Sequence, residues 1–197
     1  MEFTLTYAGK LLAQTTDEKR LPNRSLHVHE IRKEFHKQLK ILWSVHPNLQ
    51  RPEHYPDEMF RGKIQRVERE GFCWLPLATN GNGLVCKLEI LLLRHGNPGR
   101  VLFDIDNRLK TLFDALRMPK GPDELGENTA LGKQCPTPDE VPFYVLLEDD
   151  NLITHVAVAS DWLLEPVPDT PADNAVRAII KVTVRPYHVH MDNSDFA

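Results

Sequence analysis

Residues 103–116 have the sequence FDIDNRLKTLFDAL, in which a short extended stretch delivers two carboxylates to the start of a helix. Asp104 and Asp106 are two residues apart, so in an extended chain both side chains point to the same side. Asp106 also suits the N-cap of the helix, where a side-chain oxygen accepts a free backbone N–H. The stretch therefore predicts two anionic ligands at the first turn of a helix.

The predicted helix has one apolar and one charged side. Apolar residues at helical spacing predict the side that packs on the core: Leu109, Leu112, Phe113 and Leu116. Charged residues recur at every fourth position on another side: Asp106, Lys110 and Asp114. We expect Asp114 to pair with Lys110 one turn away and to hold its amine near the acidic residues.

The two carboxylates predict a cation site, because neighbouring carboxylates repel each other unless a cation lies between them. Oxygen ligands without a nearby thiol or imidazole favour Mg²⁺, with Mn²⁺ as the second choice, over zinc. A second acidic pair, Asp149 and Asp150, lies between apolar stretches at the mouth of a predicted strand and could complete the metal site. The alternative for each short motif is a solvated turn or a helix cap.

The longer pattern resembles the RusA family of Holliday-junction resolvases. It consists of Asp-x-Asp-Asn-x-x-Lys-x-x-x-Asp-Ala-Leu, beginning at Asp104, and of a later Asp-Asp pair before a β-rich segment. The resemblance is close over residues 100–116 and 146–160 and holds only in outline elsewhere. It implies that Asp104, Asp106 and Asp150 bind magnesium and that Lys110 is needed for cleavage. We place Asp149, Asp114 and Asn107 around these residues in supporting positions.

The resemblance implies a homodimer that cleaves branched DNA, such as a four-way junction, in recombination or repair. One alternative is a module that keeps the fold and binds DNA without cleaving it, which the acidic composition and a long insertion favour. Another is a small-molecule enzyme that holds a metal–diphosphate group, but the chain lacks a Gly-rich phosphate loop.

The charge of the chain is unevenly distributed. The net charge of −4 is unusual for a nucleic-acid-binding protein. However, residues 1–100 hold 16 Lys and Arg against 11 Asp and Glu, whereas residues 101–197 hold 8 against 17. We therefore expect DNA contacts from the first half of the chain and from the turn before the aspartate motif. The candidates are Lys19, Arg20, Arg24, Arg32, Lys33, Arg94 and Arg100.

The composition of the 197 residues, 41% hydrophobic and 26% charged, is typical of one globular domain. No apolar run approaches the roughly 18 residues of a membrane span, and the first residues do not resemble a signal peptide. We expect a cytoplasmic protein without membrane contact. Its three cysteines, Cys73, Cys86 and Cys135, are too widely spaced for a thiolate zinc site and are expected to be reduced.

Hydrophobic periodicity predicts an α+β fold: a mixed sheet of about four to six strands with two main helices. One helix is expected over 25–45, ended by Pro47, and a β-hairpin over 72–77 and 84–93, around Asn80-Gly81-Asn82-Gly83. Further strands are expected at 3–7, 145–147, 153–162 and 176–184. We expect one domain over 1–187, with an insertion at 118–142 that forms a flexible flap, and a C-terminal tail over 188–197.

Overall fold

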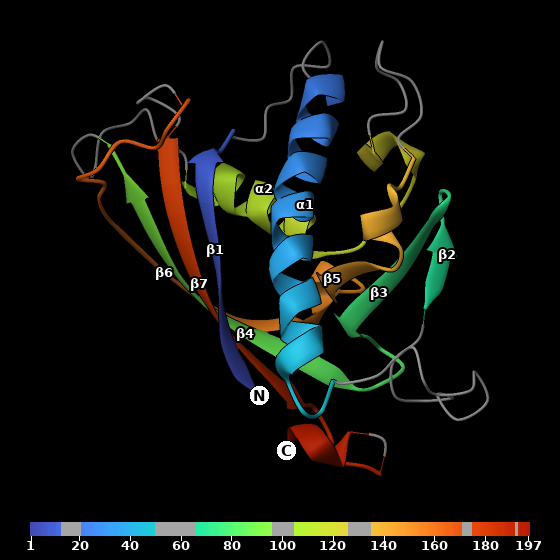
Figure 1. Ribbon diagram of the computed structural model, residues 1–197. Helices are drawn as coiled ribbons and strands as arrows, with labels where there is room; N and C mark the ends of the chain where they lie inside the picture. The colour runs from blue at the N-terminus through green and yellow to red at the C-terminus, as the bar shows by residue number, and fades with distance from the viewer. Residues whose placement is uncertain (13–20, 50–65, 96–104, 126–134, 171–174, 192) are drawn as a thin grey trace.

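The computed structural model describes residues 1–12, 21–49, 66–95, 105–125, 135–170, 175–191 and 193–197. In these ranges two α-helices and seven strands form an α+β fold (Figure 1). The helices are α1 (Leu21–Val45) and α2 (Ile105–Leu116). The strands are β1 (Glu2–Lys10), β2 (Val67–Arg69), β3 (Phe72–Ala78), β4 (Leu84–Arg94), β5 (Phe143–Leu147), β6 (Ile153–Trp162) and β7 (Ala175–Pro186). The predicted α+β class with two main helices is confirmed.

The strands divide between two sheets rather than forming one. Sheet A has the order β1-β7-β4-β6, in which β7 is antiparallel to both neighbours and β4 is parallel to β6. Sheet B has the order β2-β3-β5, with β3 and β5 parallel. β4 pairs with β7 on one side and with β6 on the other, so it is a central strand of sheet A.

The predicted β-hairpin is wrong, because β3 and β4 belong to different sheets. The side chain of Asn82 makes the hydrogen bonds of the intervening turn. Its Oδ1 accepts from the N–H groups of Thr79 and Leu84 at 2.9 and 3.1 Å, and its Nδ2 donates to the carbonyl of Leu77 at 2.9 Å. Gly83 follows with a φ of 63°, which glycine adopts without steric cost. The predicted turn is therefore present, but it leads the chain from sheet B to sheet A instead of joining two paired strands.

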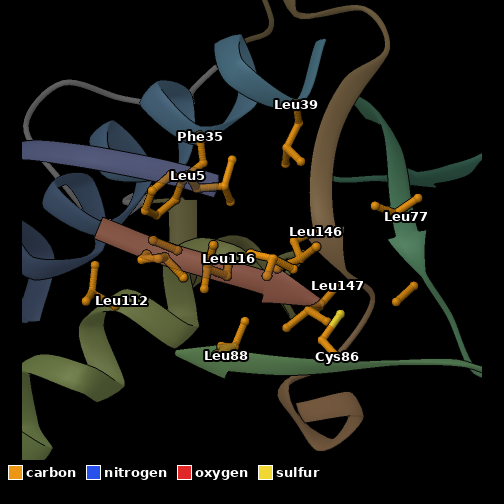
Figure 2. Close-up of a cluster of buried hydrophobic side chains, with 14 of the residues drawn as sticks. Leu5, Phe35, Leu39, Leu77, Cys86, Leu88, Leu112, Leu116, Leu146 and Leu147 are labelled. Atoms are coloured by element: carbon orange, nitrogen blue, oxygen red, sulfur yellow. The ribbon is translucent and has the colours of Figure 1, made fainter. Parts of the chain in front are cut away.

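The main core lies where both helices meet side chains from the two sheets (Figure 2). Alternate residues of β4, such as Cys86 and Leu88, are buried on the inner face of sheet A. The second helix buries Leu112 and Leu116 as expected, whereas Leu109 and Phe113 are only partly buried. Among the described residues, neither helix combines the length and apolarity that a membrane span requires.

The segments around the expected insertion and tail pack on the domain. Met118 and Leu125 are buried in a second apolar cluster with residues of sheet B, and residues 126–134 of the expected flap lie outside the described ranges. At the other end of the chain Asn193 and Phe196 are buried, and Asn193 Nδ2 donates to the carbonyl of Asn82 at 3.0 Å. Residues 193–197 are thus part of the domain rather than a separate tail.

Three histidines on α1 are buried: His27, His29 and His36. Burial, with help from the charges of Arg32 and Lys33, lowers the pKa of His29 from 6.5 to about 3. Burial also lowers the pKa of His27 to about 4 and that of His36, whose Nδ1 accepts the N–H of Tyr144 at 2.9 Å. The folded protein therefore holds these rings neutral at pH values where the unfolded chain protonates them.

This burial predicts that the free energy of unfolding falls as the pH drops below 6.5. The unfolded chain then binds protons that the folded chain excludes, and His29 alone contributes up to about 1.4 kcal/mol per pH unit until the pH nears its folded pKa. We expect His29→Gln to reduce this pH dependence in urea unfolding between pH 7 and pH 5. His188→Gln, at an exposed position, is the matched control. An unchanged slope in His29→Gln would show that His29 is not kept neutral by the fold.

Candidate functional site

The first part of the candidate site lies at the start of α2. Asp106 and Lys110 are exposed there, one turn apart, and Asn107 is half-buried beside them. Asp104 lies outside the described residues. Lys110 lies on the helix as expected. Asp106 lies within the first turn rather than at the predicted N-cap, because α2 already begins at Ile105.

The second acidic pair lies toward the other end of α2. Just after α2, the N–H of Met118 donates to the carbonyl of Leu147 at 2.9 Å, so the end of β5 lies beside the end of the helix. Asp149 and Asp150 follow two and three residues later, whereas α2 rises about 15 Å between Asp106 and Leu116. Accordingly, the described residues contain no group of three or more acidic, His or Cys side chains placed to hold a metal ion.

Asp149 and Asp150 are held by a short turn and by a lysine. Asp149 caps the 3₁₀ turn Asp150–Leu152, because its Oδ1 accepts the N–H of Asn151 at 3.1 Å. The Nζ of Lys120 lies 3.0 Å from Oδ2 of Asp149 and 3.6 Å from Oδ1 of Asp150. The ammonium group thus contacts both carboxylates, as a bound metal cation would.

Lys120 is a residue of the site that no sequence pattern predicted. It lies in a Gly- and Pro-containing segment, Met118-Pro119-Lys120-Gly121-Pro122, which was expected to form part of a mobile flap. No periodicity or motif connects it with an acidic pair nearly thirty positions later. The backbone pairing of Met118 with Leu147 brings the lysine to the aspartates.

The environment keeps Asp149 ionised. Partial burial raises its pKa, but the hydrogen bond from the N–H of Asn151 and the ion pair with Lys120 outweigh this effect and hold the pKa below its usual value of 3.8. The hydrogen bond to Asp149 in turn raises the pKa of Lys120. The side chains remain accessible, at 28% for Asp149, 43% for Asp150 and 53% for Lys120. A pair this exposed contributes less than about 1 kcal/mol, so a competing cation can displace the lysine.

Asp114 has different partners from the one expected. Its carboxylate pairs with Arg24 Nη2 at 2.6 Å and Arg117 Nη2 at 2.8 Å, and not with Lys110. Arg117 also forms a two-point contact with Glu124, at 2.8 and 2.9 Å. Asp114 lies with the two arginines on the packed side of α2, whereas Lys110 lies on its exposed side. Asp114 therefore belongs to an internal ionic network.

The structure also corrects part of the expected DNA-contacting set. Arg32 is fully buried, and Arg94 is buried with its Nε donating to Ser160 Oγ at 3.0 Å. Both side chains are therefore unavailable at the surface. Arg32 is covered by Trp74 and by the end of α2, whose carbonyls accept from it, and helical periodicity alone does not reveal these contacts. Arg24 is engaged by Asp114. Of the four remaining candidates, Lys19, Arg20 and Arg100 lie outside the described residues, and only Lys33 can be placed.

Lys33 lines an open groove of about 690 Å³ between α1 and the 3₁₀ turn Pro138–Glu140. It pairs with Glu140 at 3.1 Å, and two other lysines of the groove pair with acidic residues: Lys37 with Glu34 and Lys40 with Asp139. Positive charge in this groove is therefore largely compensated, which makes it a poor phosphate-binding surface.

We expect Asp114→Ala to destabilise the protein by about 2 kcal/mol, because Arg24 loses its counter-charge and Arg117 keeps only Glu124. Lys110→Ala, on the exposed side of the same helix, is the control and should change stability by less than about 0.5 kcal/mol. Urea unfolding measures both. Equal stabilities for the two variants would mean that Asp114 has no structural role in this network.

Comparisons with known proteins add no relative to this picture. A scan against models of protein families finds no match, and neither does a comparison with curated protein sequences. The aspartate motif and the acidic pair remain the observations from which a function can be argued.

Proposed function

We propose that the protein is a magnesium-dependent endodeoxyribonuclease that cleaves four-way junctions or related branched DNA. The observation that carries the proposal is the exposed acidic pair of Asp149 and Asp150, which already binds one cationic group, Lys120. The second support is the resemblance of residues 104–116 and of the acidic pair to the RusA family. The test is whether the purified chain nicks a labelled four-way junction, but not a matched linear duplex, in magnesium and not in EDTA.

The donor chemistry of the acidic pair fits magnesium. Magnesium prefers oxygen ligands, often binds through only one or two carboxylates, and keeps several waters. Asp150 is half-exposed, and the low pKa of Asp149 leaves its carboxylate ionised at neutral pH. Asp150, with Asp149 in support, is the metal ligand that the described residues favour. Asp104 and Asp106, with Asn107 in support, are assigned as ligands from the resemblance alone, because Asp106 lies at the opposite end of α2 from the acidic pair. Bound magnesium would activate water and neutralise charge on the scissile phosphate.

Lys110 is assigned to the chemistry rather than to the fold. It is exposed on α2, one turn after Asp106. An ammonium group near a scissile phosphate stabilises the extra negative charge of the pentacovalent transition state. Asp114, which is committed to Arg24 and Arg117, acts on the site only by fixing α2.

Two symmetric cuts across a junction require two sites, and two copies related by a two-fold axis provide them. The proposal therefore includes a homodimer that acts on DNA in the cytoplasm. Its DNA contacts are assigned to exposed cations near the site, Lys110 and Lys120, and to the basic segments outside the described residues.

A non-catalytic DNA-binding module is the second candidate. It is favoured by Lys120, which occupies the space between the two carboxylates, and by the acidic excess of residues 101–197. Junction binding without nicking, unaffected by magnesium, would support this candidate over the nuclease.

Asp150→Asn and Lys110→Ala should separate DNA binding from cleavage. Asp150→Asn removes a ligand charge at similar size, so nicking should fall by orders of magnitude while binding in EDTA persists or tightens. The gain would be roughly 1 kcal/mol, because less negative charge repels the phosphate. Lys110→Ala should also lose nicking, but without tighter binding.

Gel-shift and nicking assays on the same junction measure both effects. Asp139→Asn is the control, since that side chain is almost fully exposed and pairs only loosely with Lys40, at 3.7 Å. Parental nicking by Asp150→Asn in magnesium would remove Asp150 from the metal site.

Lys120→Met should lower the magnesium concentration needed for half-maximal nicking. The lysine competes for the carboxylates, and an exposed pair worth less than about 1 kcal/mol limits the change to about five-fold. Lys87→Met is the matched control, because Lys87 pairs with Glu89 at 2.6 Å on β4, in a different part of the fold. A higher magnesium requirement in Lys120→Met would instead make Lys120 an aid to metal binding.

A further inference from the structure

The two edge strands of sheet A, β1 and β6, differ in whether another group uses their free hydrogen-bonding positions. At the β1 edge, the side chain of Gln38 on α1 takes the place of a neighbouring strand. Its Oε1 accepts the N–H of Thr6 at 2.9 Å and its Nε2 donates to the carbonyl of Thr6 at 2.7 Å. The charged ends of β1, Glu2 and Lys10, further discourage strand addition. This edge is closed.

The β6 edge has no strand partner among the described residues. β6 is the last strand of sheet A and lies at one side of the molecule, away from α1 (Figure 1). No described residue pairs with its outer edge. The eight residues from Ile153 to Ser160 include no Lys, Arg, Asp, Glu or Pro, which are the residues that commonly protect such edges.

Apolar side chains of β6 are exposed on the face that sheet A otherwise uses for its core. Val156 and Val158 stand in register with Leu88 and Ile90 of β4, which are buried, yet they are 40% and 37% exposed. Trp162 on the same face is 49% exposed. A long, neutral, partly apolar edge strand of this kind is suited to pairing with another strand.

The sequence of β6 is complementary to itself when two copies run antiparallel about Val158. In that register His155 of each copy faces Asp161 of the other, on the outer face of the sheet. A histidine N–H can donate to the carboxylate, and such opposite residues lie close enough to interact. The remaining pairs place Ala157 opposite Ala159 and Val156 opposite Ser160, which fit without crowding.

We propose that β6 pairs antiparallel with β6 of a second copy, about a two-fold axis at Val158, so that two four-stranded sheets become one of eight strands. This inference rests on the proposed function in naming a second copy as the occupant, because the two cuts need two sites. The His155 and Asp161 complementarity argues for a second copy over an unrelated peptide.

The first test is the mass of the full chain by light scattering at micromolar concentration, without DNA or magnesium. The parental chain should be a dimer. Val158→Lys places two ammonium groups opposite each other at the axis and should give a monomer. Thr4→Lys, an exposed position on the closed β1 edge, should remain a dimer. A parental monomer, or a Val158→Lys dimer, would overturn the interface.

Charge exchange and cross-linking test the register even if Val158→Lys does not fold. Asp161→Lys should weaken the dimer, and the double variant His155→Asp with Asp161→Lys should restore it. In a Cys135→Ser background, Val158→Cys should form an intermolecular disulfide on mild oxidation, because opposite Cα atoms in an antiparallel pair are about 4.5 to 5.5 Å apart. Failure of both would reject this register.

These measurements are independent of nuclease activity. A dimer that obeys them but never nicks junctions would leave the interface standing and remove the proposed function. Junction nicking by a chain whose dimer is insensitive to every β6 variant would support the proposed function and reject the β6 interface.

Discussion

The arrangement of the two helices depends on one buried side chain, Arg32. Its guanidinium donates to the carbonyls of Asp114 and Arg117 at 2.8 and 3.1 Å, and it lies 5.9 Å from the ring centre of Trp74. The last carbonyls of a helix have no partner within it, and here an arginine from another helix supplies the donors. Burial lowers the pKa of Arg32 to about 10, which still leaves it charged at neutral pH. A charge this deep is tolerated only where hydrogen bonds of this kind surround it.

The same network leads from the core to the candidate site. Arg117, directly after α2, binds Glu124, whose Oε2 also accepts the N–H of Lys120 at 3.1 Å. The backbone of Lys120 is thus fixed by the buried charges, while its side chain extends to Asp149 and Asp150. The acidic pair is therefore positioned by interactions on both sides: the turn after β5 and the segment after α2.

Local patterns in the sequence predicted the elements well and their partners poorly. The strand predicted over 153–162 matches β6 at both ends, and helical spacing with Pro47 predicted the end of α1 at Val45. These signals depend on neighbours along the chain. The turn at Asn82 was recognised, but whether the strands it joins pair with each other depends on which strands compete for them.

The candidate site shows the same limit. The positions of Asp106 and Lys110 on a helix followed from their spacing, as did the acidic pair before a strand. The burial of Arg32 and the approach of Lys120 to the pair did not, because each depends on contacts between segments far apart in the sequence.

The strand order of sheet A sets the order in which its strands can pair during folding. β7 lies between β1 and β4 and pairs with both over nearly its full length, although it is the last strand of the chain. Until it arrives, β1 has no strand partner, and the ends of a very long loop must be brought together at an entropic cost. Folding dominated by such distant pairings is slow. During synthesis, β1 therefore lacks a strand partner and β4 is paired only with β6 until β7 is made, so that one edge of β4 is left open to pairing with other chains.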